Sequence, residues 1–324
     1  MEEQQHIRSI HKVSKDYRVL GTWCDLALYG EYDTILLDAA YNMIQYYEDL
    51  FTVNRDRSEV MRINHAAGDR AVGVSNATYT LIKRAVNESR QHYGFNAAIG
   101  PLVKLWHIGF EDARVPTNEE ISECQKLINP DNIVLNDDTF SVYLTQKGME
   151  LDLGGIAKGY IADRIHDFWR AYGLTVGIVN LGGNLLMMGD APHHADGKWR
   201  VGIRNPLTQT DETIVTITTG ASSVVTSGIA ERHFEVAGKS YHHIIDPETG
   251  YPHDNDIASV TVLSRESIDG EIETTRLFFA DAPLPAYDYG AMFIYKDKSI
   301  ELVNLPQEAI DISNPEFYFK ESKK

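Results

Sequence analysis

One ten-residue segment combines residue types and spacing that can bind an anion: residues 151–160, Leu-Asp-Leu-Gly-Gly-Ile-Ala-Lys-Gly-Tyr. Leu151 and Leu153 alternate with Asp152 as in a half-buried strand, and apolar residues recur with helical spacing after the two glycines. Backbone N–H groups at the start of a helix attract phosphate, and Lys158 would add an ammonium in the first turn. The junction matches neither common nucleotide-binding template, and a Gly-Gly turn can also serve packing alone.

A second candidate for chemistry lies in a predicted hairpin that begins at Arg232 and returns over residues 240–245. Side chains alternate along a strand, so His242 and His243 face opposite sides and only one of them can face a given site. A histidine here, shortly before Asp246, could act in catalysis, and the alternation alone leaves open whether that is His242 or His243. A lone strand histidine can also be a structural hydrogen-bonding group.

A third candidate is a pair of oxygen ligands, Glu271 and Thr275, four residues apart on a predicted helix and hence on one face. A carboxylate with a hydroxyl suits Mg²⁺ that keeps water and phosphate as its other ligands. Taken alone, the same pair also fits a solvated helix face. Asp269 competes for the role, but its spacing of six residues from Thr275 places it on a different face.

The elements that must position these residues are interspersed helices and strands. Helices are predicted from an Asp33 cap to about Leu50, from a Ser75 cap to about Tyr93, after Gly100-Pro101, after a Thr117 capping box, after the Gly-Gly junction, and over 267–280. Strands are predicted at 17–29, three times within 133–153, at 176–186, at 199–203, twice within 212–226, in the 232–245 hairpin, at 257–264 and at 289–295. Without a regular βαβ rhythm, an α+β or mixed-sheet fold is favoured over a doubly wound one.

Composition narrows the classes of partner. The chain of 324 residues has 43% apolar residues, enough for a real core, and its 47 acidic against 30 basic residues give a net charge of −17. That charge repels nucleic acid and anionic lipid, so we expect neither as a partner. Any nucleotide or flavin must be held by a local positive site. Cys24 and Cys124 are too far apart to suggest a zinc knuckle or a disulfide framework.

The N-terminal residues are polar, and no segment approaches membrane-spanning length. From this we expect a cytoplasmic protein. We predict an N-terminal extension over residues 1–16, a single domain over 17–312, and a polar C-terminal tail over 313–324.

Several motifs, taken in order, resemble those of the ApbE family of flavin transferases. They are residues 20–22 (Leu-Gly-Thr), 58–64 (Ser-Glu-Val-Met-Arg-Ile-Asn), 95–103 (Phe-Asn-Ala-Ala-Ile-Gly-Pro-Leu-Val), 151–160, 180–184 (Asn-Leu-Gly-Gly-Asn), 226–228 (Thr-Ser-Gly) and 243–250 (His-Ile-Ile-Asp-Pro-Glu-Thr-Gly). The resemblance spans about residues 20–294. It implies an ApbE-like, T-fold-related α+β architecture of mostly antiparallel sheets flanked by helices.

The resemblance also implies an activity. Members of this family cleave FAD and pass FMN to a Thr or Ser hydroxyl of a target flavoprotein, which releases AMP and leaves a phosphodiester-linked flavin. Magnesium would be the cofactor and FAD the substrate. The partner would be an acceptor flavoprotein with a Ser/Thr attachment segment.

Carried over by position, the resemblance gives each candidate a role. Asp152 and Lys158 would contact FAD, the carbonyl of Gly155 would complete a metal site with Glu271 and Thr275, and His243 matches the functionally important histidine. The positions that would line the dinucleotide pocket are Leu20, Asn54, Gly94, Phe95, Asn96 and Ile245.

The chain departs from the family pattern at some of these positions. Glu271 stands where Asp is usual, and Thr274 replaces a carboxylate sometimes found beside the ligand threonine. Asn54 replaces an aromatic residue, while Leu20 and Asn96 replace the usual Met and Asp. Two alternatives therefore stay open: an Mg²⁺-dependent hydrolase that splits FAD into FMN and AMP, and a noncatalytic flavin-binding protein.

Overall fold

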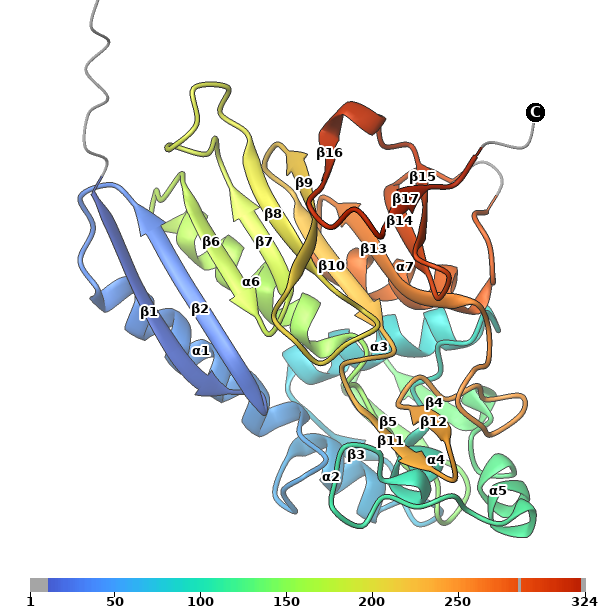
Figure 1. Cartoon of the computed structure of the whole chain (residues 1–324). Coiled ribbons are helices and arrows are strands. Elements are labelled where there is room, and N and C mark those ends of the chain that lie inside the picture. Colours follow the sequence, from blue (N-terminus) through green and yellow to red (C-terminus); the bar gives the residue numbers. More distant parts are fainter. Residues whose placement is uncertain (1–10, 285–286, 322–324) are drawn as a thin grey trace, which may run out of the picture.

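A computed structural model of the protein describes residues 11–284 and 287–321. Residues 1–10 of the predicted N-terminal extension and 322–324 of the predicted tail lie outside the described residues. None of the described helices is both long and apolar enough to cross a membrane. The elements combine helices with mostly antiparallel sheets, which confirms the predicted α+β class (Figure 1).

The largest element is a nine-stranded sheet. Neighbouring strands pair antiparallel, except that the last two run parallel. In spatial order the strands are β1 (Lys12–Val19), β2 (Thr22–Tyr29), β6 (Gly177–Leu181), β7 (Asn184–Met188), β10 (Ser223–Gly228), β13 (Ile257–Ser264), β14 (Gly290–Tyr295), β15 (Ser299–Val303) and β17 (Tyr318–Phe319).

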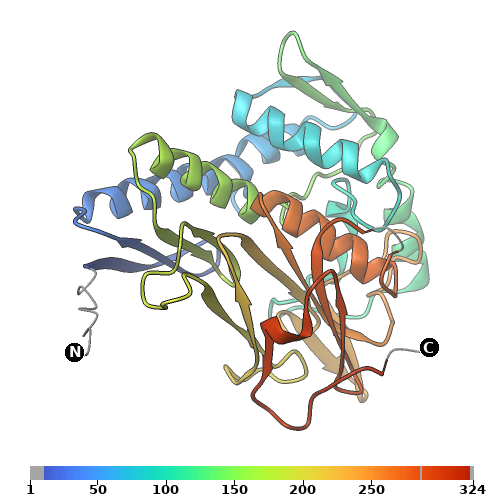
Figure 2. The same cartoon turned by 90° about the horizontal axis from the view of Figure 1, so that it is seen from above.

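Three helices lie side by side across one face of this sheet (Figure 2). They are α1 (Ile35–Phe51), α6 (Ala157–Ala171) and α7 (Ser267–Phe279). Apolar residues recur along α6 every three or four positions, and this stripe is buried against the sheet, with Ile161, Ile165 and Trp169 each at 0% exposure. The middle helix, α6, thus packs its apolar stripe on the sheet and begins directly after the Gly-Gly junction.

The other face of the large sheet is covered in part by a three-stranded sheet of β8 (Trp199–Arg204), β9 (Thr213–Thr219) and β16 (Ile310–Ile312). The remaining elements form a smaller lobe (Figure 1). They are α2 (Glu59–His65), α3 (Asn76–Ser89), α4 (Gly100–Trp106), α5 (Asn118–Gln125), β3 (Val72–Gly73), β4 (Ile133–Asn136), β5 (Ser141–Leu144) and the hairpin of β11 (His233–Val236) and β12 (Lys239–His242).

Local capping signals placed the helix starts correctly. The Ser75 side chain accepts a hydrogen bond from Thr78 N and begins α3, and Thr117 and Glu120 form the complete capping box of α5. The Asp33 carboxylate accepts from Ile35 N, although the cap position of α1 is Thr34. The predicted end of α3 at Tyr93 was wrong, because the helix stops at Ser89.

The predicted single strand at 17–29 is instead a hairpin of β1 and β2. The chain turns at Leu20 and Gly21, which have φ of 56° and 69°. Glycine adopts this left-handed conformation readily, but leucine does not signal it, so the turn was missed. The strand also begins at Lys12, inside the predicted N-terminal extension, because its outward residues are polar and carry no apolar signal.

Three other predictions were wrong for similar reasons. Residues 151–153 belong to no strand, and Asp152 N donates to Ala97 O at 2.9 Å. The return strand of the hairpin ends at His242, short of His243. Strands β15, β16 and β17 follow the last predicted strand, and β17 lies in the predicted polar tail. The three added strands form because each pairs with another strand, and no local apolar pattern marks them in the sequence.

Candidate active site

The Gly-Gly junction opens α6 as predicted. The Asp152 carboxylate accepts a hydrogen bond from Gly154 N at 2.7 Å, which shapes the turn. The Ile156 side chain at the N-cap position makes no capping hydrogen bond. Ile156 N and Ala157 N donate to Leu153 O at 3.0 and 2.9 Å, and the Gly159 N–H faces the Glu271 carboxylate. Lys158 is the second residue of the helix. The junction therefore brings the positive end of the helix dipole and an ammonium together at one end of α6.

A close approach of two helices brings this end of α6 to α7. A Cβ on Gly159 would lie 2.6 Å from the backbone oxygen of Ser267, so only glycine fits there. The Asp163 carboxylate accepts from Ser267 N at 2.7 Å and from Ile268 N at 2.9 Å, and so caps α7 from the neighbouring helix. Burial raises the pKa of Asp163 to about 6.

This packing places Lys158 Nζ 4.0 Å from Glu271 Oε1. Glu271 is only 5% exposed, and burial raises the pKa of its carboxyl, while the Lys158 charge and the Asn184 hydrogen bond oppose the rise. The structure thus confirms that Glu271 faces inward and does not lie on a solvated helix face.

Asn184, the first residue of β7, was missed as a functional residue. Its Nδ2 donates to Glu271 Oε1 at 2.7 Å, and its Oδ1 accepts from Ser267 Oγ at 2.7 Å. Asn184 is 1% exposed, so both bonds are shielded from water. The Asn-Leu-Gly-Gly-Asn motif marked the position, but its partner is 87 residues away in the sequence. The amide holds the Glu271 carboxylate in one orientation.

Thr274, Thr275 and Asp269 of α7 point in different directions around the helix and have different partners. Thr275 Oγ1 donates to the backbone oxygen of Glu271 at 3.1 Å, which leaves the hydroxyl lone pairs available. Thr274 is fully buried and accepts from Ser227 Oγ at 2.9 Å. Asp269 instead accepts from Arg84 Nη2 at 2.8 Å, so it lies away from Glu271.

His243 follows β12 directly. Its Nδ1 lies 3.2 Å from the backbone oxygen of Arg232. A carbonyl oxygen can only accept, so Nδ1 carries the proton and Nε2 keeps its lone pair. Burial lowers the pKa of His243 to about 4, and the nearby charges of Arg232 and Lys158 act in the same direction. The neutral imidazole is therefore the form present at neutral pH.

The loop at Gly94–Asn96 lies between the start of α6 and the end of α7. A Cβ on Gly155 would sit 3.5 Å from the Phe95 ring, and a Cβ on Gly94 would lie 2.2 Å from the Phe279 ring. Gly94 has a φ of 106°, a further reason for glycine. The Asn96 amide donates to Ile128 O, in a distant segment, and accepts from Ala98 N in its own loop, each at 2.8 Å.

Leu20 and the segment around Asn54 are linked through Glu48 near the end of α1. Leu20 N donates to Glu48 Oε1 at 3.1 Å, and Glu48 Oε2 lies 3.6 Å from Arg55 Nη2, next to exposed Asn54. Burial raises the pKa of the Cys24 thiol to about 12, and Lys158 and Glu48 both act on that thiol. The β1–β2 turn thus lies on the Lys158 side of the molecule.

Ile245 differs from the other predicted pocket residues. It is 7% exposed and packs in a cluster with Leu102 and Trp106, so its side chain mainly serves the core of the smaller lobe. Glu231 was not predicted. Glu231 is partly exposed to solvent, but loss of water around its carboxyl raises the pKa of Glu231. The positive charges of Lys158 and Arg232 oppose this rise. Glu231 in turn raises the pKa of Glu271, so it belongs to the same charge cluster.

Together, the fold and site define a class of protein: an α+β protein in which a helix N-terminus and a lysine face a buried carboxylate. The sequence model of the ApbE family matches residues 20–285. The chain therefore belongs to the ApbE family, and the resemblance found in the sequence is confirmed.

Relatives and solved structures agree with this assignment. A Klebsiella pneumoniae (strain 342) protein named FAD:protein FMN transferase is 44% identical over 296 residues, covering 89% of this chain and 90% of that protein. A Treponema pallidum (strain Nichols) protein of the same name is 34% identical over 315 residues, covering 90% and 86%. The crystal structure of an ApbE protein from Thermotoga maritima is similar with a TM-score of 0.83 and 28% identity, covering 91% and 97%.

Proposed function

We propose that this chain transfers FMN from FAD to a Ser or Thr hydroxyl of an acceptor flavoprotein. The acceptor oxygen bonds to the FMN phosphorus, the diphosphate bridge breaks, and AMP leaves with the bridging oxygen. The hydroxyl proton passes to a base. The product is a phosphodiester-linked flavin, as expected from the motifs.

The observation that carries this proposal is the placement of Lys158 and the N-terminus of α6 beside the buried carboxylate of Glu271. The 44% identical relative named FAD:protein FMN transferase supports the same chemistry. A diphosphate at this helix end would meet the positive end of the helix dipole and an ammonium. These groups stabilise negative charge that develops on the transferred phosphoryl group.

We assign the base to His243. Its Nδ1 donates to the Arg232 carbonyl, so Nε2 keeps the lone pair that a base needs. Asp152 fixes the Gly-Gly turn and would contact FAD. We keep Leu20, Asn54, Gly94 and Phe95 as pocket-lining residues, with Asn96 and Ile245 acting mainly through the shape of their loops.

The residues present fit a magnesium ion. The Gly155 carbonyl, the Glu271 carboxylate and the Thr275 hydroxyl are hard oxygen donors, and the described residues contain no group of three His, Cys, Asp or Glu that would select a softer metal. When bound there, Mg²⁺ would supply positive charge at the phosphate oxygens. Asn184 orients Glu271 for this role, and Lys158 balances the carboxylate charge when the ion is absent.

The acceptor is expected to be a cytoplasmic flavoprotein with a Ser/Thr attachment segment. Water in place of the acceptor hydroxyl would give FMN and AMP, so the same site can hydrolyse FAD. The test is incubation with FAD, Mg²⁺ and a candidate acceptor domain, followed by intact mass of the acceptor and assay of AMP. An acceptor heavier by one FMN unit supports transfer, and AMP with free FMN alone would replace transfer with hydrolysis. Neither product, with FAD still bound, would leave only a flavin-binding role.

A further inference from the structure

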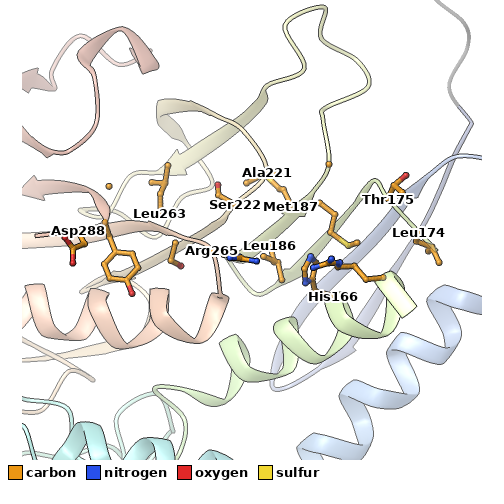
Figure 3. A pocket seen from close by; sticks show the side chains of 16 residues that line it. His166, Leu174, Thr175, Leu186, Met187, Ala221, Ser222, Leu263, Arg265 and Asp288 are labelled. Atoms are coloured by element: carbon orange, nitrogen blue, oxygen red, sulfur yellow. The ribbon is translucent and has the colours of Figure 1, made fainter. Parts of the chain in front are cut away.

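A cavity of about 720 Å³ lies at the opposite end of α6 from the Gly-Gly junction (Figure 3). From Lys158 to Arg170 the helix rises by roughly 18 Å at 1.5 Å per residue, so this cavity is separate from the candidate active site. Its volume falls in the range of about 300–1,000 Å³ typical of small-molecule sites. It is lined by the last turns of α6, the end of β7, the β9–β10 turn, the end of β13 and the residues before β14.

The walls of the cavity are mainly apolar. Leu186 and Met187 of β7 and Leu263 of β13 form much of the lining, and Tyr289 adds an aromatic ring. Leu186 and Met187 are 2% and 4% exposed, so the wall is built on rigid strands of the large sheet. An apolar body of a ligand would find contact area here.

Three nitrogen-bearing side chains are gathered at one part of the lining: His166, Arg170 and Arg265. Among the described residues, neither guanidinium has a carboxylate within ion-pair distance or a side-chain hydrogen bond. Figure 3 shows Arg265 and His166 reaching toward each other, with Asp288 at the far side of the cavity. His166 Nδ1 lies 4.0 Å from Asp167, an exposed residue paired with Arg164 at 2.9 Å.

The pKa of His166 agrees with this geometry. Burial lowers it, and the charges of Arg170 and Arg265 lower it further against the opposing charge of Asp167. A neutral imidazole can donate or accept one more hydrogen bond beside the two guanidinium groups. The whole chain has a net charge of −17, which repels anions. Arg170 and Arg265, which have no ion-pair partner among the described residues, make the lining of this cavity locally positive.

We propose that this cavity binds a small organic anion with an apolar body. Its carboxylate or phosphate group would lie on the Arg170 and Arg265 guanidinium groups, whose planar forks match such oxygens. Its apolar part would lie on Leu186 and Met188, which face the α6 side of the sheet. This site goes beyond the proposed transferase activity and does not depend on it.

The test uses anilinonaphthalene sulfonate, an aromatic anion whose fluorescence rises in apolar surroundings, titrated into the full chain with and without saturating FAD. We expect one saturable site whose affinity is unchanged by FAD. Uncharged N-phenylnaphthylamine, which lacks the sulfonate, should bind at least about tenfold more weakly, the size expected for one charge-assisted hydrogen bond.

The double variant Arg170→Ala/Arg265→Ala should lose about tenfold or more in affinity for the sulfonate probe. Both side chains are exposed, so folding is expected to survive. The matched control is Lys83→Ala/Arg200→Ala, which removes the same charge from surface pairs elsewhere. Ala221→Trp, which fills the cavity from the β9–β10 turn, should also weaken binding.

Three results would overturn the proposal. Equal affinity of the arginine variant and the wild type would show that these groups hold no anion. Competition by FAD would place the probe in the flavin site. Equal binding of the neutral and anionic probes would reduce the cavity to an apolar surface.

Discussion

Two carboxylates of α7, Glu271 and Asp269, are only two residues apart in the sequence but differ in burial and in hydrogen-bond partners. Glu271 is buried, faces Asn184 and Lys158, and has its pKa raised by burial. Asp269, two residues earlier, accepts from Arg84 at 2.8 Å and lies near Tyr289 on another face. The difference shows that one helix can place one carboxylate in a partly exposed ion pair and hold another buried against a lysine and an amide.

The largest effect should come from the histidine beside the Glu271 face. His243→Gln is expected to lower turnover by about 10²–10⁴, the usual worth of a general base, while FAD still binds. The control is His242→Gln, which alters the adjacent buried histidine and should retain transfer. Steady-state rates of acceptor labelling, with FAD binding measured separately, decide the result. Equal losses in the two variants would remove the base assignment.

The most direct test of the comparison is a matched pair on α7. Glu271→Gln keeps the shape but removes the charge, so the Mg²⁺ concentration needed for half-maximal activity should rise by about tenfold or more. Asp269→Asn should leave that concentration unchanged and cost at most about 1 kcal/mol of unfolding free energy, because the Arg84 pair is partly exposed. A rise in the Asp269 variant instead would reverse the assignment of the two carboxylates.

A smaller effect on Mg²⁺ affinity is expected at Asn184, which bonds the proposed ligand Glu271 and not the ion itself. Asn184→Ala frees the Glu271 carboxylate from its orienting hydrogen bond, and Mg²⁺ affinity should fall by about 10-fold, within the usual range for such outer partners. Calorimetric Mg²⁺ binding without FAD measures this directly. The control is Asn205→Ala, a buried asparagine that donates to Glu212 at 3.0 Å. If both variants bound Mg²⁺ like the wild type, Asn184 would have only a packing role.

The pH dependence of stability tests how the histidines are held. Burial lowers the pKa of His242 from 6.5 to about 4, and its Nδ1 accepts from Ile244 N at 3.3 Å. The unfolded chain therefore binds more protons between those values, so stability is present above pH 6.5 and is lost as pH falls to about 4.

His242 should contribute on the order of 3 kcal/mol to that loss. Urea unfolding at pH 7 and pH 4.5 should show a smaller fall for His242→Gln than for the wild type, because the amide cannot be protonated. An equal fall in both proteins would assign the pH dependence to other groups.

Several features could be predicted because their signals are local. Ser75 and Thr117 cap their helices within three residues, and the Gly-Gly junction opens α6 through a change of periodicity at Gly154 and Gly155. Helical spacing also separated Asp269 from Thr275. The outlying strands were not predictable in this way. β1 has polar outward residues, and β17 is short and set only by pairing with β15.

The sequence by itself determined the starts of α3, α5 and α6, the α+β class and the family motifs, because caps, periodicity and motif order are properties of neighbouring residues. Only the tertiary structure decided which motifs meet. Asp163 caps α7 from another helix, Gly159 lets the two helices touch, and Asn184 reaches Glu271 across 87 residues of sequence. These contacts depend on packing of distant segments in one core, which no local spacing specifies.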